Sequence, residues 1–464
     1  MRTASPHVGV GPQGRFSERR GTDFADQQSA AFFKLLKFFE SATYLLILFY
    51  FSGVITGIIF PPVDDLSAEN PLARIMWFPI YGLVLVLAIM NVTHLVRLAI
   101  FNPLLILCLL WCAVSMIWSI DPTLTIRRSV AVLMTTLAGL TVAARYDWDG
   151  FVQRLAFVFF MMALATVVMV LVKPGQGIMQ EIHAGAWRGP FPEKNYLGGK
   201  MAQGLAVCMC AYAMRPKRLW LWVPAGALCF LLVIMSTSKT ALLVSLFSIG
   251  AFLALRLFRR YPILRLPVLY ILVVAITTLI TLYLTIPDEL FALIGKDATF
   301  TGRTDIWSEL ILAVEKKPIM GYGYGTFWKD PLGPSYAVRQ ALQWGVPTAH
   351  NGWFETSLST GIVGVILFAV FYVFSLFLAF DRVKRGGVEA YWAVLGILIF
   401  GIFSFSESTI LQQNDLSWLI FVATASKLFA FERAYWRDGE QLSYALGRRD
   451  DLPVRRARRY DQRT

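Results

Sequence analysis

Long apolar runs alternate with short polar connections along most of the chain. Runs of about 20 apolar residues recur, and each is long enough to cross roughly 30 Å of hydrocarbon as a helix. Lipid offers the backbone no hydrogen-bond partners, so such runs must be helical. The pattern predicts an all-α, polytopic membrane protein with about 12 transmembrane helices, at 42–60, 75–90, 103–120, 129–144, 151–172, 199–214, 219–236, 239–258, 266–286, 353–380, 388–405 and 416–431.

One long polar segment, residues 287–350, interrupts this alternation. It separates a first group of nine predicted spans, 42–286, from a last group of three, 351–431. A polar tail rich in Gly, Pro and Arg, 1–41, precedes the spans and is predicted to be disordered. A basic tail, 432–464, follows them. We expect the functional residues where the long segment meets the membrane.

Composition and charge agree with a membrane protein. The chain is 56% hydrophobic and 16% charged, whereas a soluble domain is nearer a quarter charged. The net charge of +13 does not indicate nucleic-acid binding, because the basic residues concentrate in the C-terminal tail and in alternate connections. This asymmetry predicts that both termini are cytoplasmic, that the long loop lies outside, and that the basic tail touches anionic membrane lipids.

The five cysteines all lie inside apolar runs, so neither a disulfide framework nor a Cys/His metal site is indicated. No metal and no cofactor is predicted. The predicted outward face instead collects polar residues in four places: 187–198, 236–240, 301–307 and 350–351.

Lys239 lies in a very short turn between two predicted spans. A charge at the membrane boundary is costly unless it snorkels, pairs or binds an anion. Arg303 could hold phosphate oxygens with two parallel hydrogen bonds. Arg188 and Lys194 are further candidates for binding an anion, but each of these residues also suits an ordinary interface or loop position.

His350 stands where the next apolar run begins, and its ordinary pKa of about 6.5 suits a general base. A histidine there also fits a plain interfacial role. The sequence leaves open whether a carboxylate serves as the base instead, and the candidates are Glu193, Asp305, Glu355 and Glu407.

The long segment contains two recognisable local patterns. Residues 305–317 predict a short amphipathic helix that ends at Pro318, and its apolar face comprises Ile306, Leu310, Ile311 and Val314. Residues 321–325, Gly-Tyr-Gly-Tyr-Gly, lack the Lys-Ser/Thr ending of a P-loop. They predict a turn in which the glycines take positive φ, with tyrosines that stack on a sugar or sit at the interface.

Four motifs, in this order along the chain, resemble the O-antigen ligase and polymerase superfamily. They are the turn Ser236-Thr237-Ser238-Lys239-Thr240, the element Gly302-Arg303-Thr304-Asp305-Ile306-Trp307, the segment Gly321-Tyr322-Gly323-Tyr324-Gly325-Thr326-Phe327, and His350-Asn351 followed by Gly361-Ile362-Val363-Gly364. Residues 191–198, Phe-Pro-Glu-Lys-Asn-Tyr-Leu-Gly, are most similar to the ExoQ-type exopolysaccharide polymerases. Ligases commonly have arginine at the position of Lys239, which also favours that branch.

The resemblance implies a GT-C-like glycosyltransferase of the bacterial inner membrane, metal-independent and inverting, with one large periplasmic loop. Its donor would be an undecaprenyl-diphosphate-linked oligosaccharide. Lys239 and Arg303 would bind the diphosphate, and His350 would activate the acceptor hydroxyl. Residues expected to contact substrate are Arg127, Arg128, Arg188, Glu193, Lys194, Asn195, Asp305 and Asn351.

Other functions stay open beside a polymerase of exopolysaccharide or O-antigen-type repeat units. A ligase would instead use lipid A-core as acceptor. A transporter of lipid-linked oligosaccharide also has about twelve spans, but it tends to show internal repeats and polar groups at mid-membrane, and neither is evident. A non-catalytic scaffold is a third alternative. A chain-length regulator and export proteins are candidate partners.

Overall fold

The computed structural model describes residues 32, 34–60, 71–180, 183–264, 303–329, 332–384 and 387–430. The chain divides into two units, Met1–Leu46 and Ile47–Thr464, and the second contains the candidate site. The tail 432–464, the predicted span 266–286 and the loop residues before Arg303 lie outside the described residues. The prediction of a disordered tail over 1–41 is wrong for residues 34–41, which are helical because their apolar residues continue the first apolar run.

All regular secondary structure among the described residues is helical, apart from one isolated bridge between Ile178 and Trp187. In the first half of the second unit the helices are α2 (Val54–Ile59), α3 (Pro71–Ile75), α4 (Trp77–Met90), α5 (Val92–Phe101), α6 (Pro103–Val114), η1 (Ser115–Ile117), α7 (Pro122–Arg145), α8 (Trp148–Val172) and α9 (Pro174–Gly177). The second half contains α10 (Lys194–Met214), η2 (Pro216–Arg218), α11 (Leu219–Met235), α12 (Lys239–Arg260), η3 (Pro262–Leu264), α15 (Arg303–Lys316), α16 (Ser335–Leu342), α17 (Gly352–Lys384), α18 (Glu389–Ser404) and a last helix over Leu416–Ala430.

Six helices in the described part of the chain are long and apolar enough to cross a membrane, so the chain is a multi-pass, all-helical membrane protein. They comprise Pro71–Met90, α7, α8, Pro216–Met235, α12 and α17. A seventh candidate is the pair Val92–Phe101 and Pro103–Ile117, which is bent by 91°. α18 and the last helix are shorter apolar helices. The larger number of about twelve spans stays a prediction.

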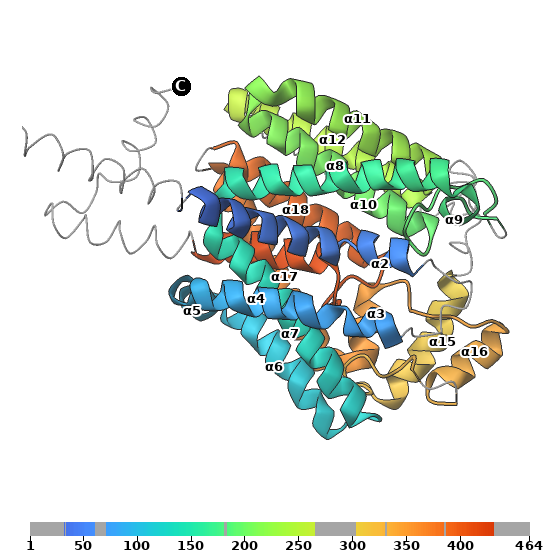
Figure 1. The fold of residues 1–464 in the computed structure, drawn as a ribbon. Helices are drawn as coiled ribbons and strands as arrows, with labels where there is room; N and C mark the ends of the chain where they lie inside the picture. Colours follow the sequence, from blue (N-terminus) through green and yellow to red (C-terminus); the bar gives the residue numbers. More distant parts are fainter. Residues whose placement is uncertain are drawn as a thin grey trace, which may run out of the picture. The chain divides into compact units, whose positions relative to one another are not determined.

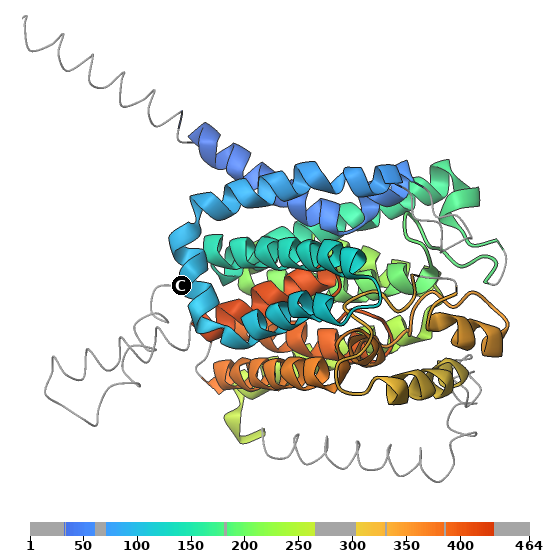
Figure 2. The same cartoon turned by 90° about the horizontal axis from the view of Figure 1, so that it is seen from below.

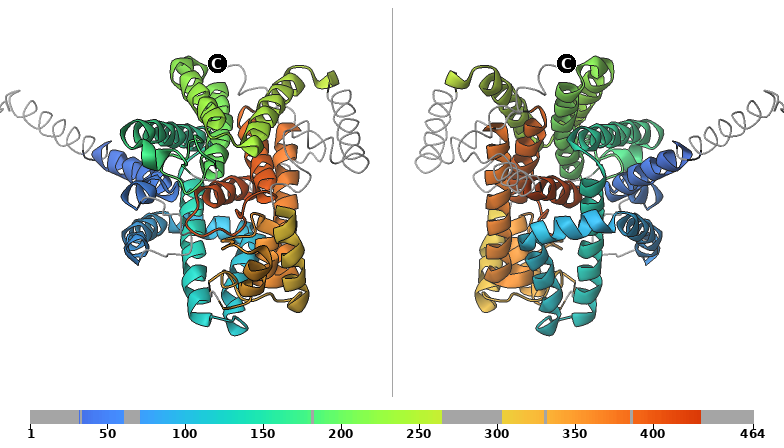
Figure 3. Two further views of the ribbon diagram at one scale, coloured as in Figure 1. Left: turned by 90° about the vertical axis from the view of Figure 1, so that its right-hand side faces the viewer. Right: turned by 90° about the vertical axis from the view of Figure 1, so that its left-hand side faces the viewer.

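The long helices of the second unit lie side by side, and α10 runs through their middle. α10 packs against α8, α11, α12 and α18 (Figure 1). It can approach them closely because it contains small residues: a Cβ added at Gly204 would lie 3.0 Å from Cys229 Sγ. Turning the bundle shows α15 and α16 at the same end as α9 (Figure 2). That end faces the viewer on the left of Figure 3.

An aromatic core joins α17, α18 and the last helix. The rings of Phe400 and Phe421 stack with centroids 4.2 Å apart, and Phe368 contacts both. Trp418, fully buried, lies against the same group and donates its indole N–H to Thr136 Oγ1 of α7. Such aromatic contacts add specificity to packing beyond area alone. They fix the ends of α17 and α18 from which the site loops emerge.

A break near the start of α17 comes from Gly361, whose φ is +67°. The break lets Ile362 N–H bond to Pro318 O, which ties the end of the α15 segment to α17. A side chain at this position has no room, since its Cβ would lie 2.0 Å from Ile319 O, a backbone atom.

Gly361→Ala should therefore lower the free energy of unfolding by more than the roughly 1 kcal/mol that is typical of a point substitution. The measurement is the midpoint of thermal unfolding in detergent, which should fall. Gly82→Ala is the matched control, because no atom lies within 4 Å of a Cβ added at this α4 position. There the change should be neutral or stabilising. Equal midpoints for the two variants would contradict the role given to Gly361.

Candidate functional site

The glycine-rich segment 321–325 lies at the end of the bundle that carries the candidate site and connects the segments around it. Positive φ values of 68°, 101° and 72° occur at Gly321, Gly323 and Gly325, as predicted. Tyr322 is buried, and its hydroxyl donates to Ala313 O of α15. Tyr324 is also buried, and its hydroxyl donates to Leu411 O. Both tyrosine hydroxyls therefore hold neighbouring segments together.

α15 positions Arg303, which is its first described residue. Ile306 and Leu310 of α15 are buried, as predicted, whereas Ile311 is 47% exposed and the prediction for it is wrong. Ala313 takes the buried place, since a short helix lying on its support buries only a narrow stripe. Trp307 donates its indole N–H to Ala349 O at 3.0 Å, which fixes the start of α15 beside the segment leading to His350.

Arg303, Glu407 and His350 form one cluster. Arg303 Nη2 lies 3.3 Å from Glu407 Oε1, and His350 Nδ1 lies 3.8 Å from Glu407 Oε2. All three side chains are largely buried, with exposed fractions of 15%, 20% and 15% respectively. One carboxylate thus lies between the two residues to which the family resemblance assigns charge stabilisation and proton transfer. We refer to these three residues as the Arg–Glu–His cluster.

His350 adopts a left-handed backbone, with φ of 45°, immediately before α17. The next residue, Asn351, accepts hydrogen bonds from Trp353 N and Phe354 N through Oδ1, at 2.9 and 3.2 Å. It therefore caps α17 in the manner of helix N-cap residues. This contact explains the asparagine through backbone geometry, and its predicted substrate contact stays a prediction.

Lys194, Asn195 and Lys239 lie together at the start of α10 and α12. Ser238 Oγ donates to Asn195 Oδ1 at 3.0 Å, which joins the two predicted motifs. Burial and the nearby Lys239 ammonium lower the pKa of Lys194. Burial and Lys194 in turn lower the pKa of His183. Like charges that interact in this way favour the binding of an anion beside them.

Lys239→Ala should raise the pKa of Lys194 toward its ordinary value, because a neighbouring positive charge is removed while burial remains. The pH at which Lys194 becomes half-reactive toward an amine-acylating reagent, followed by mass spectrometry, should move upward. Lys173→Ala, at the end of α8, is the control and should leave the profile in place. An unchanged profile in Lys239→Ala would show that the two ammonium groups do not interact.

The other predicted substrate residues have varied surroundings. Arg188 Nε donates to Gln176 O at 2.9 Å, so it holds the connection after α9. Glu193 precedes α10 and makes no side-chain cap hydrogen bond. Asp305 and Arg127 are exposed, and Arg127 does not line the cavity described next. Arg128 does line it, and its guanidinium donates to Gly325 O.

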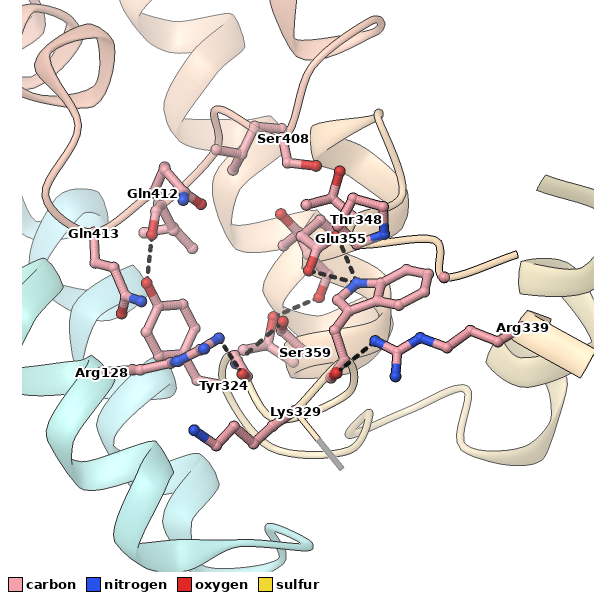
Figure 4. A pocket seen from close by; sticks show the side chains of 18 of the residues that line it. Arg128, Tyr324, Lys329, Arg339, Thr348, Glu355, Ser359, Ser408, Gln412 and Gln413 are labelled. Carbon is pink, nitrogen blue, oxygen red and sulfur yellow. Dashed lines mark hydrogen bonds between the residues drawn. The ribbon is translucent and has the colours of Figure 1, made fainter. Parts of the chain in front are cut away.

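A cavity of about 710 Å³ lies between these segments, and Figure 4 shows it from close by. Its walls come from α7, α10, α16, α17 and the polar connection after α18. Tyr196, Thr348 and Ser408 all line it. Tyr196 follows Lys194 on α10, while Thr348 and Ser408 neighbour His350 and Glu407. The cavity thus adjoins the segments that carry His350 and Glu407, and its Tyr196 belongs to the same helix as Lys194.

Of the residues that line the cavity, the sequence singles out Arg128, Tyr324 and Glu355 but not most of the others. It does not predict the bridging role of Glu407, which is only one of four candidate bases. A signal was present in the connection between the predicted spans 388–405 and 416–431. Residues 406–415 contain two serines, a threonine, two glutamines and an asparagine within a short stretch. So many hydrogen-bonding side chains at a membrane boundary indicate a binding surface.

Two comparisons with known proteins agree with the resemblance drawn from the motifs. A family model described as O-antigen ligase matches residues 224–369, which include Lys239, Arg303 and His350. The exopolysaccharide production protein ExoQ of Rhizobium meliloti (strain 1021) is 24% identical over 335 residues. That alignment covers 69% of this chain and 75% of the relative.

Proposed function

We propose, from the premise that this chain belongs to the O-antigen ligase and polymerase superfamily and is ExoQ-like, that it polymerises lipid-linked repeat units of an exopolysaccharide. The donor is an oligosaccharide on undecaprenyl diphosphate, and the acceptor is a sugar hydroxyl of another repeat unit. The observation that carries the proposal is the Arg–Glu–His cluster. The interacting ammonium groups of Lys194 and Lys239, at the starts of α10 and α12, support it.

The positively charged side chains stabilise the leaving group. When the bond between the anomeric carbon and the phosphate oxygen breaks, the electron pair and the developing charge go to the lipid diphosphate. Preorganised positive groups stabilise that charge where it appears, which is the role that metal ions fill elsewhere. Arg303, Lys239 and Lys194 supply such groups from three separate segments. We propose that they do so without a metal.

The acceptor hydroxyl loses its proton as its oxygen bonds to the anomeric carbon, and His350 takes that proton. Glu407 orients the imidazole and stabilises its charged form, which is the arrangement of a base held by a third group. The 3.8 Å separation of Nδ1 and Oε2 is longer than a hydrogen bond and can shorten when substrate is bound. Direct attack by the acceptor in a single step inverts the anomeric centre.

The proposal includes a location. The end of the bundle that carries α9, α15 and α16 faces the periplasm of a bacterial inner membrane. The opposite end carries Arg215, Arg218, Arg259 and Arg260 and faces the cytoplasm, in keeping with the positive-inside rule. A chain-length regulator and export proteins are its proposed partners, because a polymer made at this face has to be limited and removed.

Purified protein incubated with lipid-linked repeat units, and no added acceptor, tests the reaction. A ladder of products, separated by whole repeat units, supports the polymerase. Products that form only when lipid A-core is supplied would assign the protein as a ligase. Movement of the lipid-linked oligosaccharide across a vesicle membrane without elongation would assign it as a transporter.

A further inference from the structure

The cavity shown in Figure 4 lies next to the reacting groups rather than around them. None of Arg303, His350 and Glu407 lines it. However, Thr348 Oγ1 accepts from His350 N, and Ser408 directly follows Glu407. A ligand in the cavity can therefore extend one end toward His350 while the rest lies away from the diphosphate. The volume of about 710 Å³ falls within the usual range for small-molecule sites, about 300–1,000 Å³.

The lining suits a saccharide. The indoles of Trp328 and Trp344 offer flat apolar faces, and the amides of Gln412 and Gln413 offer both donors and acceptors. Two of the lining atoms, Ser408 Oγ and Gln413 Oε1, are buried without a hydrogen-bond partner. Unsatisfied buried polar atoms are rare and need an explanation. Sugar hydroxyls donate and accept, so a bound saccharide would satisfy both atoms.

The charge of the cavity favours an acidic ligand. Arg128, Lys329 and Arg339 line it from three different segments, whereas Glu355 is the single carboxylate among the described residues that line it. That carboxylate already accepts from Trp328 Nε1 at 3.0 Å and from Ala349 N at 3.2 Å. Arg128 donates to Gly325 O, an uncharged acceptor that leaves the positive charge of the guanidinium in place. The described residues that line the cavity therefore carry a net positive charge.

We propose that this cavity is the acceptor subsite and that it selects an oligosaccharide carrying a carboxylate, which Arg128 and Lys329 hold. The inference rests on the proposed function, since it assigns the acceptor class of that same reaction. It places the acidic sugar away from the reacting hydroxyl, in the part of the cavity formed by α7 and the 325–329 segment (Figure 4).

Binding to the full-length protein in nanodiscs, measured by calorimetry, tests this. The probes are cellobiouronic acid, cellobiose and farnesyl diphosphate. Cellobiouronic acid should bind about tenfold more tightly than cellobiose, because a charge-assisted hydrogen bond replaces a neutral one. Equal affinities for the two disaccharides, or no binding of either at millimolar concentration, would overturn the proposal. So would displacement of cellobiouronic acid by farnesyl diphosphate, which would mark the cavity as the diphosphate site.

Two variants separate charge from stacking. Lys329→Gln should reduce the preference for the acid to about two- or threefold and leave cellobiose binding unchanged. Trp344→Leu should weaken both disaccharides equally. Trp220→Leu, which changes a 72% exposed tryptophan on α11, is the control and should bind all probes as the unmodified protein does. A full acid preference in Lys329→Gln would overturn the role of this lysine.

One further variant keeps this proposal apart from the proposed function. His350→Ala should bind cellobiouronic acid normally and yet make no polymer. If the unmodified protein binds cellobiouronic acid but never elongates lipid-linked repeats, that result would count against the polymerase and not against the subsite. Elongation without any acid preference would count against the subsite alone.

Discussion

Arg303→Ala should lower the rate of repeat-unit transfer by about 10²–10³, the usual loss when one group that stabilises transition-state charge is removed. The effect has two parts. The positive charge that faces the leaving diphosphate disappears, and Glu407, 3.3 Å from Arg303 Nη2, is left uncompensated where the anion has to bind. Arg303→Lys should retain part of the activity, because a point charge remains while the two parallel hydrogen bonds of a guanidinium are lost.

The measurement is the initial rate of ladder formation by purified protein at a fixed concentration of lipid-linked repeat unit. Arg218→Ala is the matched control, since this exposed arginine belongs to η2, just beyond the far end of the 21-residue α10. Its rate should equal that of the unmodified protein. Full activity in Arg303→Ala, with the protein present in the membrane, would remove Arg303 from the mechanism.

The helices follow closely from the sequence because their cause is local. An apolar run of sufficient length has to become a helix in lipid, whatever its neighbours are. The positive φ values of the glycine-rich turn were predictable for the same reason, since alternating glycines permit them. Where the local pattern stops being decisive, prediction fails. Ile311 and Ala313 flank the buried Leu310 on opposite sides of α15, and the positions of α16 and α17 decide which of the two is buried.

The motifs of the candidate site were predicted to share the outward face, but the contacts of Arg303 and His350 with Glu407 were not predicted. The order and type of residues identified Lys239, Arg303 and His350, but no pattern pairs Arg303 with a carboxylate 104 residues later in the chain. That pairing depends on α18 ending beside the start of α15. Asn351 shows the converse: a polar residue in a motif acts as a helix cap, which a single sequence cannot distinguish from a substrate contact.

Glu407→Gln should lower the rate of transfer by about 10², through His350 rather than through contact with substrate. The amide keeps the shape of the side chain but cannot stabilise a charged imidazole 3.8 Å away. His350→Ala should lower the rate of transfer by at least the same factor, because this variant lacks the proton acceptor itself. Glu407→Asp should recover part of the activity, since the negative charge is kept at a slightly greater distance.

A double-mutant cycle shows whether Glu407 acts on His350. Residues that work as a unit are strongly non-additive, so the double variant Glu407→Gln/His350→Ala should transfer no more slowly than His350→Ala alone. In the Arg303→Ala background, Glu407→Gln should lower the rate of transfer by a smaller factor than it does alone. It removes the uncompensated carboxylate, and this gain offsets part of the loss that comes from a less well oriented imidazole. Additive losses for Glu407 and His350 would mean that the carboxylate acts independently, either on the acceptor directly or only on the packing of α15. Thermal unfolding midpoints of the three variants distinguish these two cases, since a packing role lowers the midpoint and direct contact with the acceptor does not.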